Sequence, residues 1–199
     1  MNIDKFYNKE KNLIASWLIY KKMEIFFSKI LGNAFQVVNF KFSELELKVN
    51  SNNIYPMFFF LKKHTYCQYD CLVDIVGYDT PGKRLRFGII YNLLSVRYNT
   101  RIKVVTKVSS VSALISITSL FFGAAWMERE IFDLCGVFFT LNKDLRRILT
   151  DYGFNGYPLR KDFPLTGYIE SFYDDNQKKV SYKPVELSQE YRNFNFKAF

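Results

Sequence analysis

Residues 66–108 read YCQYDCLVDIVGYDTPGKRLRFGIIYNLLSVRYNTRIKVVTKV, and they contain the clearest structural pattern in the chain. Alternating apolar and polar side chains, many of them β-branched or aromatic, predict strands over residues 66–76, 84–95 and 101–108. The connections, over 77–83 and near Asn99, contain residues typical of turns. Because strands joined by short turns pair antiparallel, the simplest arrangement is an antiparallel meander.

The residues before this stretch add two helices and two strands to the prediction. Asn12 is a suitable helix cap and Gly32 a suitable stop, with helical apolar spacing between them and lysines on the other side. Pro56 suits the start of a second helix, which ends at two lysines. The predicted elements are a helix over 13–31, strands over 35–42 and 44–49, a turn over 50–53 and a helix over 57–61.

The residues after the meander first show a helical pattern and then become rich in proline and glycine. Helical spacing returns over residues 116–134, interrupted near Gly123, and residues 144–149 could add one or two turns. Beyond Tyr152, prolines and glycines exclude a long helix. We therefore predict an α+β fold, with helices packed on an antiparallel sheet, formed by residues 1–150, and a mostly extended partner-binding tail over residues 151–199.

Composition limits the classes of protein that fit. The chain has 199 residues, of which 49% are hydrophobic and 19% aromatic, so disorder is excluded. Its net charge of +9 favours acidic partners such as nucleic acid, anionic lipid or an acidic protein. Three cysteines suggest a reducing compartment. The first helix is too interrupted by charges to span a bilayer, and the first dozen residues do not resemble a transit peptide.

Two motifs invite a ligand site, and their context argues against both. His64, Cys67 and Cys71 are close in sequence, but an extended strand would hold the two cysteines too far apart for one zinc ion. Residues 77–83 match the start of a phosphate-binding loop, yet Arg84 replaces the Ser or Thr that holds magnesium, and a strand follows instead of a helix.

The sequence offers little for catalysis. A nucleophile paired with a base would have to use the single histidine, so a hydrolase is disfavoured and no catalytic residue is expected. A basic chain rich in aromatic rings could be a nucleic-acid-binding module, which remains the alternative function. Against it, the rings follow core-like spacing and no recognised nucleic-acid motif is present.

Residues 126–136 (WMEREIFDLCG), 144–154 (DLRRILTDYGF) and 156–165 (GYPLRKDFPL) combine charged residues and rings unusually densely. Together they resemble the thirty-kilodalton subunit family of NADH dehydrogenase, which is respiratory complex I. The resemblance extends to residues 61–65 (LKKHT), 74–79 (DIVGYD), 91–98 (YNLLSVRY) and 182–192 (YKPVELSQEYR). The chain departs from the family at Asn142-Lys143, where His-Pro is frequent, and at Tyr157, where His is usual.

The resemblance implies a non-catalytic structural and assembly subunit in the hydrophilic arm of proton-translocating NADH:ubiquinone oxidoreductase. FMN, iron–sulfur clusters and quinone would be bound by other subunits, and this chain would hold none. Its partners would be the quinone-site subunit, of the forty-nine-kilodalton type, and neighbouring iron–sulfur subunits, with membrane association only through the complex. The expected location is the matrix side of the mitochondrial inner membrane, or the cytoplasmic side of a bacterial inner membrane.

Candidate interface residues follow from the same segment. Charged side chains are expected to form intersubunit hydrogen bonds, and rings to serve as buried anchors. Arg129 and Asp133, four residues apart, are expected to form a pair on a helix face. The predicted partner-contacting residues are Arg146, Arg147, Asp151, Tyr152, Phe154, Arg160, Lys161, Asp162, Phe163 and Tyr168.

Overall fold

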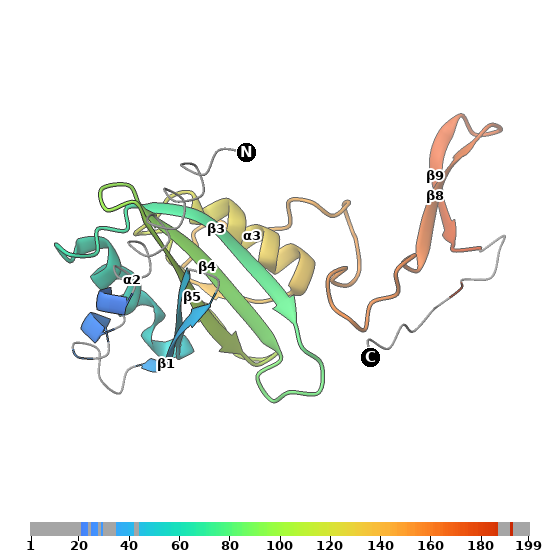
Figure 1. Ribbon diagram of the computed structural model, residues 1–199. Helices are drawn as coiled ribbons and strands as arrows, with labels where there is room; N and C mark the ends of the chain where they lie inside the picture. Colours follow the sequence, from blue (N-terminus) through green and yellow to red (C-terminus); the bar gives the residue numbers. More distant parts are fainter. Residues whose placement is uncertain are drawn as a thin grey trace, which may run out of the picture.

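The meander predicted from residues 66–108 forms three strands of a five-stranded sheet in the computed structural model (Figure 1), which describes residues 21–23, 25–27, 29, 35–41, 44–186 and 192. The strand order is β1-β2-β5-β4-β3. The strands are β1 (Phe35–Lys41), β2 (Glu44–Val49), β3 (Cys71–Asp79), β4 (Phe87–Ser95) and β5 (Thr100–Val108). The three predicted strands are therefore confirmed, although β3 begins five residues later than expected and β4 three residues later.

One strand pairing differs from the antiparallel prediction. β3–β4, β4–β5 and β1–β2 pair antiparallel, but β2 pairs parallel to β5, with Leu47 opposite Val104. Parallel neighbours need a long crossover, and here the chain between β2 and β5 forms a helix, β3 and β4 before it returns. The sheet is thus mixed.

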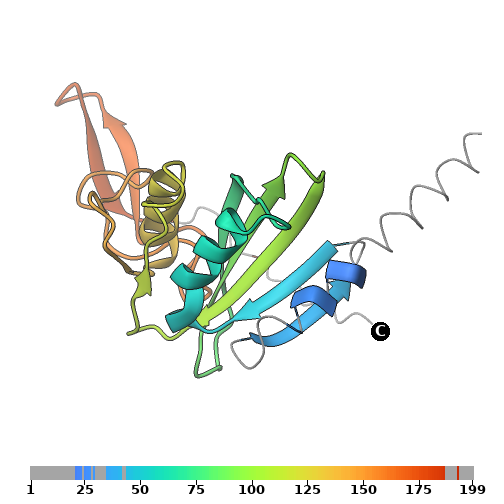
Figure 2. The same ribbon diagram turned by 90° about the vertical axis from the view of Figure 1, so that its left-hand side faces the viewer.

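Two described helices cover one face of the sheet (Figure 2). They are α2 (Ile54–Lys63), which follows the 3-10 turn η2 (Ser51–Asn53), and α3 (Ala124–Cys135). The ring of Phe58 on α2 packs edge-on against Tyr91 of β4 with centroids 4.9 Å apart. Gly77 lies against Ile131 of α3, and the strand register puts Gly77 and Tyr91 on the same face of the sheet. The core therefore lies between this face and the two helices.

Several helix boundaries correct the sequence prediction. α2 begins three residues earlier than expected because Pro56 fits within its first turn. Only the second half of the helix predicted over 116–134 forms. Residues 144–149 contain no helical turn. The helix predicted over 13–31 is described only in part, and its described residues are helical: Lys21, Lys22, Met23, Ile25, Phe26, Phe27 and Lys29. The rest of it lies outside the described residues.

The smaller sheets lie downstream. β6 (Leu114–Ile115) pairs parallel to β7 (Phe139–Thr140), and β8 (Ile169–Asp174) forms an antiparallel hairpin with β9 (Lys179–Pro184). Figure 1 shows this hairpin standing away from the five-stranded sheet. Among the described residues, none of the helices has the length and hydrophobicity that crossing a bilayer requires.

Candidate partner interface

Helix α3 carries charged side chains that are buried rather than exposed. Glu128 and Asp133 are fully buried, and Arg129 is 6% exposed. Buried charges are tolerated only where polar partners satisfy them, so these side chains should be tied to other segments. Each of the three is bound by residues that follow the helix in sequence.

Asp133 organises the segment for which a helical turn was predicted. Its carboxylate accepts hydrogen bonds from the backbone N–H groups of Ile148 (3.1 Å), Leu149 (2.7 Å) and Thr150 (2.9 Å). The Thr150 hydroxyl donates at 2.6 Å and Arg147 Nη1 at 3.1 Å. Because one carboxylate binds three successive amides, these residues curve around it instead of forming a helix.

The electrostatics of Asp133 follow from these bonds. Burial by itself raises the pKa of the carboxyl group, but the hydrogen bonds from Thr150, Leu149 and Ile148 outweigh burial and lower the pKa to about 2. Asp133 is therefore ionised at neutral pH, and its charge is balanced by Arg147.

The pair expected between Arg129 and Asp133 is replaced by two longer-range pairs. Arg129 Nη2 donates to Asp144 at 2.6 Å, while Asp133 binds Arg147. Glu128 accepts from the backbone N–H of Ile117 and from Asn142 Nδ2, both at 2.9 Å. The Ile117 bond joins the start of the segment before α3 to the helix, and within that segment the N–H groups of Leu120 and Phe121 both bond to the Ile117 oxygen.

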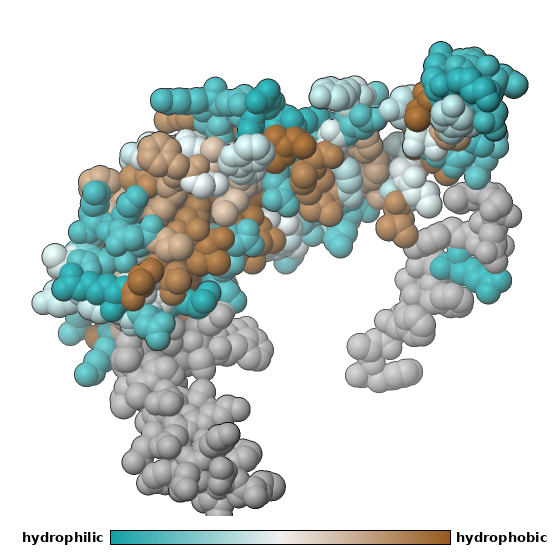
Figure 3. All heavy atoms as spheres, turned by 90° about the horizontal axis from the view of Figure 1, so that it is seen from above, coloured by the Kyte–Doolittle hydropathy of each residue, from teal (hydrophilic) through white to brown (hydrophobic). Residues whose placement is uncertain are grey.

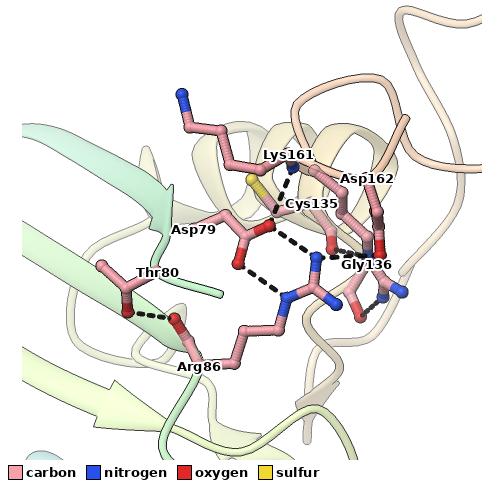
Figure 4. A network of polar contacts seen from close by, with 8 residues as sticks. Asp79, Thr80, Arg86, Cys135, Gly136, Lys161 and Asp162 are labelled. Atoms are coloured by element: carbon pink, nitrogen blue, oxygen red, sulfur yellow. Dashed lines mark hydrogen bonds and ion pairs between the residues drawn. The ribbon is translucent and has the colours of Figure 1, made fainter. Parts of the chain in front are cut away.

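A second network joins the β3–β4 loop to the tail (Figure 4). Arg86 donates two bonds to Asp79, from Nε at 2.7 Å and from Nη2 at 2.6 Å, and Nη2 also reaches Asp162 at 3.0 Å. The backbone N–H of Lys161 donates to Asp79 at 2.9 Å. The bonds from Arg86, with a smaller contribution from Lys161, hold the pKa of Asp79 below its usual range against the opposing effect of burial.

Arg160 docks the tail onto the end of α3. Its Nε donates to the backbone oxygen of Cys135 at 2.8 Å and its Nη2 to that of Gly136 at 3.4 Å. Unsatisfied carbonyls at a helix C-terminus favour such a cation. The ring of Tyr157 lies near two guanidinium groups, 4.3 Å from Arg160 and 4.9 Å from Arg147.

Both departures from the family pattern therefore have structural roles in this chain. Asn142 supplies an amide donor to Glu128, and Tyr157 supplies a ring between two cations.

The predicted interface residues divide into those engaged within the chain and those facing outward. Arg147, Arg160 and Asp162 are bound internally, Phe154 and Phe163 pack together, and Phe163 also contacts Tyr168. Asp151 accepts a hydrogen bond from the Tyr182 hydroxyl at 2.5 Å. Tyr152, Tyr168 and the side chains of Arg146 and Lys161 are exposed. Contact of any of the ten with a partner stays a prediction, as does the domain boundary at residue 150.

Exposed apolar side chains extend this surface beyond the predicted set. The spacing of apolar residues in the sequence could not identify these exposed side chains, because the same residue types also form the core. Seen from above, apolar atoms reach the surface in the middle of the molecule and are bordered by hydrophilic ones (Figure 3). Large side chains exposed near α3 and the tail include Phe122, Trp126, Phe138, Leu141, Leu149, Leu159 and Leu165.

The residues of the phosphate-loop match and of the His64–Cys71 segment lie in strand β3 and in the loops beside it. Gly77, Tyr78 and Asp79 belong to strand β3, so residues 77–83 do not open a helix. Cys67 is buried and Cys71 exposed, and burial raises the pKa of the Cys67 thiol to about 11. Among the described residues no cluster of three His, Cys, Asp or Glu side chains suits a metal ion.

Comparison with known proteins gives long matches. The family model for the respiratory-chain NADH dehydrogenase 30 Kd subunit matches residues 47–169. NADH-ubiquinone oxidoreductase subunit 9 of Reclinomonas americana is 55% identical over 153 residues, 77% of this chain and 75% of the relative. NADH dehydrogenase [ubiquinone] iron-sulfur protein 3 of Oryza sativa subsp. japonica is 52% identical over 147 residues, 74% and 77% of the two chains.

A fungal relative and a solved structure complete the comparison. The mitochondrial NADH-ubiquinone oxidoreductase 30.4 kDa subunit of Neurospora crassa is 46% identical over 193 residues, 96% of this chain and 65% of the relative. A chain in the structure of an archaeal respiratory membrane complex, the membrane-bound sulfane sulfur reductase, matches with a TM-score of 0.61 at 24% identity. That match covers 72% of this chain and 86% of the other, and it supports the fold alone.

Proposed function

Because this chain belongs to the family of the respiratory-chain NADH dehydrogenase 30 kDa subunit, we propose that its own role is to hold other subunits in position. The chain is a structural subunit of NADH:ubiquinone oxidoreductase, complex I. The comparisons give no support to the nucleic-acid-binding alternative.

The proposal places the chain in the mitochondrion, at the matrix side of the inner membrane and attached through the complex. The name of the Neurospora crassa relative, a mitochondrial subunit, supports the mitochondrial part. We assign FMN, the iron–sulfur clusters and quinone to other subunits. The donor set of this chain supports that assignment, since a cluster normally takes four thiolates and the sequence has three cysteines.

The main support for a holding role is the β8–β9 hairpin, which has one face with charged side chains and one largely apolar face. Glu170 and Lys183 form an ion pair of 3.0 Å on one face, which also carries Asp174, Lys179 and Phe172. Cross-strand neighbours on the other face are Ile169 with Pro184, Ser171 with Tyr182 and Tyr173 with Val180. On that face Ile169, Tyr173, Val180 and Tyr182 are each 56–63% exposed.

A hairpin of this kind needs a partner. Two strands by themselves are at best marginally stable in water, and the large side chains of the apolar face remain more than half exposed although the Tyr182 hydroxyl bonds to Asp151. An exposed apolar face rimmed by charges is typical of a protein–protein contact. We assign this face to the quinone-site subunit, of the forty-nine-kilodalton type, which the tail would reach.

A pair of neighbouring substitutions tests the proposal. Val180→Glu puts a charge on the apolar face, and Ser181→Glu puts the same charge on the opposite face near Lys183. Desolvating the new charge should cost several kcal/mol in the first case only. On native gels stained for NADH dehydrogenase activity, we expect the Val180→Glu chain to migrate largely apart from the active band and the Ser181→Glu chain to migrate with it.

Two results would count against the proposal. Equal migration of both variants with the active band would remove the apolar face from the interface. Absence of the unmodified chain from that band would overturn the subunit role itself.

A further inference from the structure

The outer edge of β3 is open within the part of the chain that the structure describes. β3 is the last strand of the five-stranded sheet. Just after the end of β3, Thr80 donates its backbone N–H to the Arg86 oxygen at 2.9 Å. Because hydrogen-bonded and non-hydrogen-bonded pairs alternate along an antiparallel ladder, the backbone N–H and C=O groups of residues 80, 78 and 76 point toward β4. The backbone N–H and C=O groups of residues 79, 77 and 75 therefore point outward from the open edge, on the side of β3 away from β4.

Only part of this edge is protected. The register shifts between Leu72 and Asp74, and the Asp74 side chain accepts the N–H of Ile75 at 2.8 Å. Such bulges and charges commonly shield edge strands from pairing. No described residue bonds to the outward N–H or C=O of Gly77, so the middle of the edge can still accept a strand.

A hollow lies directly beside these free groups. It encloses about 110 Å³ between the β3 edge and α3, with Ile131, Leu134 and Leu159 among its apolar walls. Gly77 allows α3 to lie close, since a Cβ there would be 3.2 Å from Ile131 Cγ2. Figure 1 shows α3 running alongside β3. A groove between an edge strand and a helix is a known geometry for capturing an extended peptide.

The rim of the hollow has a charge opposite to that of the chain as a whole. Asp74 and Glu130 border it, in a protein whose net charge is +9. Acidic side chains beside a strand-binding groove favour a basic segment and disfavour a second copy of this basic chain.

We propose that the β3 edge receives an extended segment of another subunit as an added strand, with an aliphatic side chain in the hollow and a basic side chain near Asp74 and Glu130. This inference rests on the proposed function, because it assigns the edge to a partner within the same complex. It concerns a surface separate from the β8–β9 hairpin.

Residue-resolved amide hydrogen exchange tests the proposal on the full chain and on the assembled complex. In the full chain alone, the Gly77 amide should exchange rapidly while those of Val76 and Tyr78, which bond to β4, are slow. In the complex, the Gly77 amide should slow by about a hundredfold or more, because it becomes a ladder hydrogen bond. Val76 and Tyr78 are internal controls, since they should be slow in both samples.

Three results would overturn the inference. Rapid exchange of Gly77 in a complex that retains the chain would reject strand addition while leaving the subunit role intact. Slow exchange in the monomeric chain would show that a segment of the chain itself covers the edge. Protection that grows with concentration of the chain alone would indicate pairing between copies.

A charge reversal tests the chemistry of the added segment. Glu130→Lys should lower the fraction of chain recovered with the complex about three- to tenfold, since it repels a basic strand. Glu46→Lys on β2, three strands away, is the matched control and should leave recovery unchanged. Equal recovery of the two variants would contradict a basic partner segment.

Discussion

At the scale of single residues, this chain uses buried carboxylates to fix the path of its tail. Asp133 binds three backbone amides, a hydroxyl and Arg147, and Asp79 binds Arg86 and the Lys161 amide. The charge density of this segment is visible in the sequence, but the four-residue spacing of Arg129 and Asp133 suggests a surface pair between them. Spacing of four residues permits such a pair, but it cannot reveal donors that later residues bring to the helix.

Asp133→Asn is expected to destabilise the folded chain by about 2–4 kcal/mol, because it leaves Arg147 without its counter-charge and turns an amide NH₂ toward backbone donors. Urea unfolding of the full chain measures this loss. Glu170→Gln, which breaks an exposed ion pair with Lys183, is the matched control and should cost less than about 1 kcal/mol. Similar losses for both variants would show that Asp133 does not organise the segment.

The acid sensitivity of the same variant gives a second readout. The folded pKa of Asp133, about 2, lies below the ordinary value of 3.8, so its ionised form stabilises the fold above about pH 4. That contribution is lost as pH falls through 4 toward 2. The stability difference between the unmodified chain and Asp133→Asn should therefore shrink across this interval, and a constant difference would contradict the assignment.

At the scale of elements, local pattern was sufficient for the strands and insufficient for the segments between them. Alternation located β3, β4 and β5 because each has one face on the core. Residues 116–123 and 144–149 have helical spacing, yet the Ser116 N–H bonds to Thr140 of β7, and the N–H groups of Ile148 and Leu149 bond to Asp133 of α3. Sequence could not show this, because the competing acceptors lie on a different element.

The end of α3 is expected to tolerate no side chain at Gly136. This residue has φ +75°, and its N–H donates to the oxygens of Ile131 and Phe132. A Cβ would also collide with Tyr157 and Arg160. Gly153 has a similar φ of +71° but open space around it, so Gly153→Ala carries the backbone strain without the collision.

Thermal or urea unfolding of the two alanine variants separates these effects. Gly153→Ala should cost about 1 kcal/mol from the left-handed backbone alone. Gly136→Ala should cost about 1–3 kcal/mol more, because the docked tail must shift. If both variants lose the same stability, the tail is not packed against the end of α3 as described.

At the scale of the whole molecule, the α+β class and the family were accessible from sequence, while the arrangement of parts was not. The parallel pairing of β2 with β5 depends on the path of the chain between them, and the residue pattern of neither strand shows which strand it will pair with. Residues 169–184 lie in the segment predicted as an extended tail, and register alone reveals that they form an amphipathic hairpin. The interface prediction named six charged residues and four aromatic ones, whereas many exposed apolar side chains lie elsewhere on the surface.

Holding a complex together and performing its chemistry are separate roles, and one ratio distinguishes them. In cells expressing only the Val180→Glu chain, the NADH:quinone reductase activity of assembled complex I, divided by its FMN content, should equal that of the unmodified complex while the amount of assembled complex falls. Loss of the apolar contact lowers assembly because binding energy is concentrated in few interface residues. Normal amounts of assembled complex with a reduced activity per FMN would contradict the account and place this chain in the reaction itself.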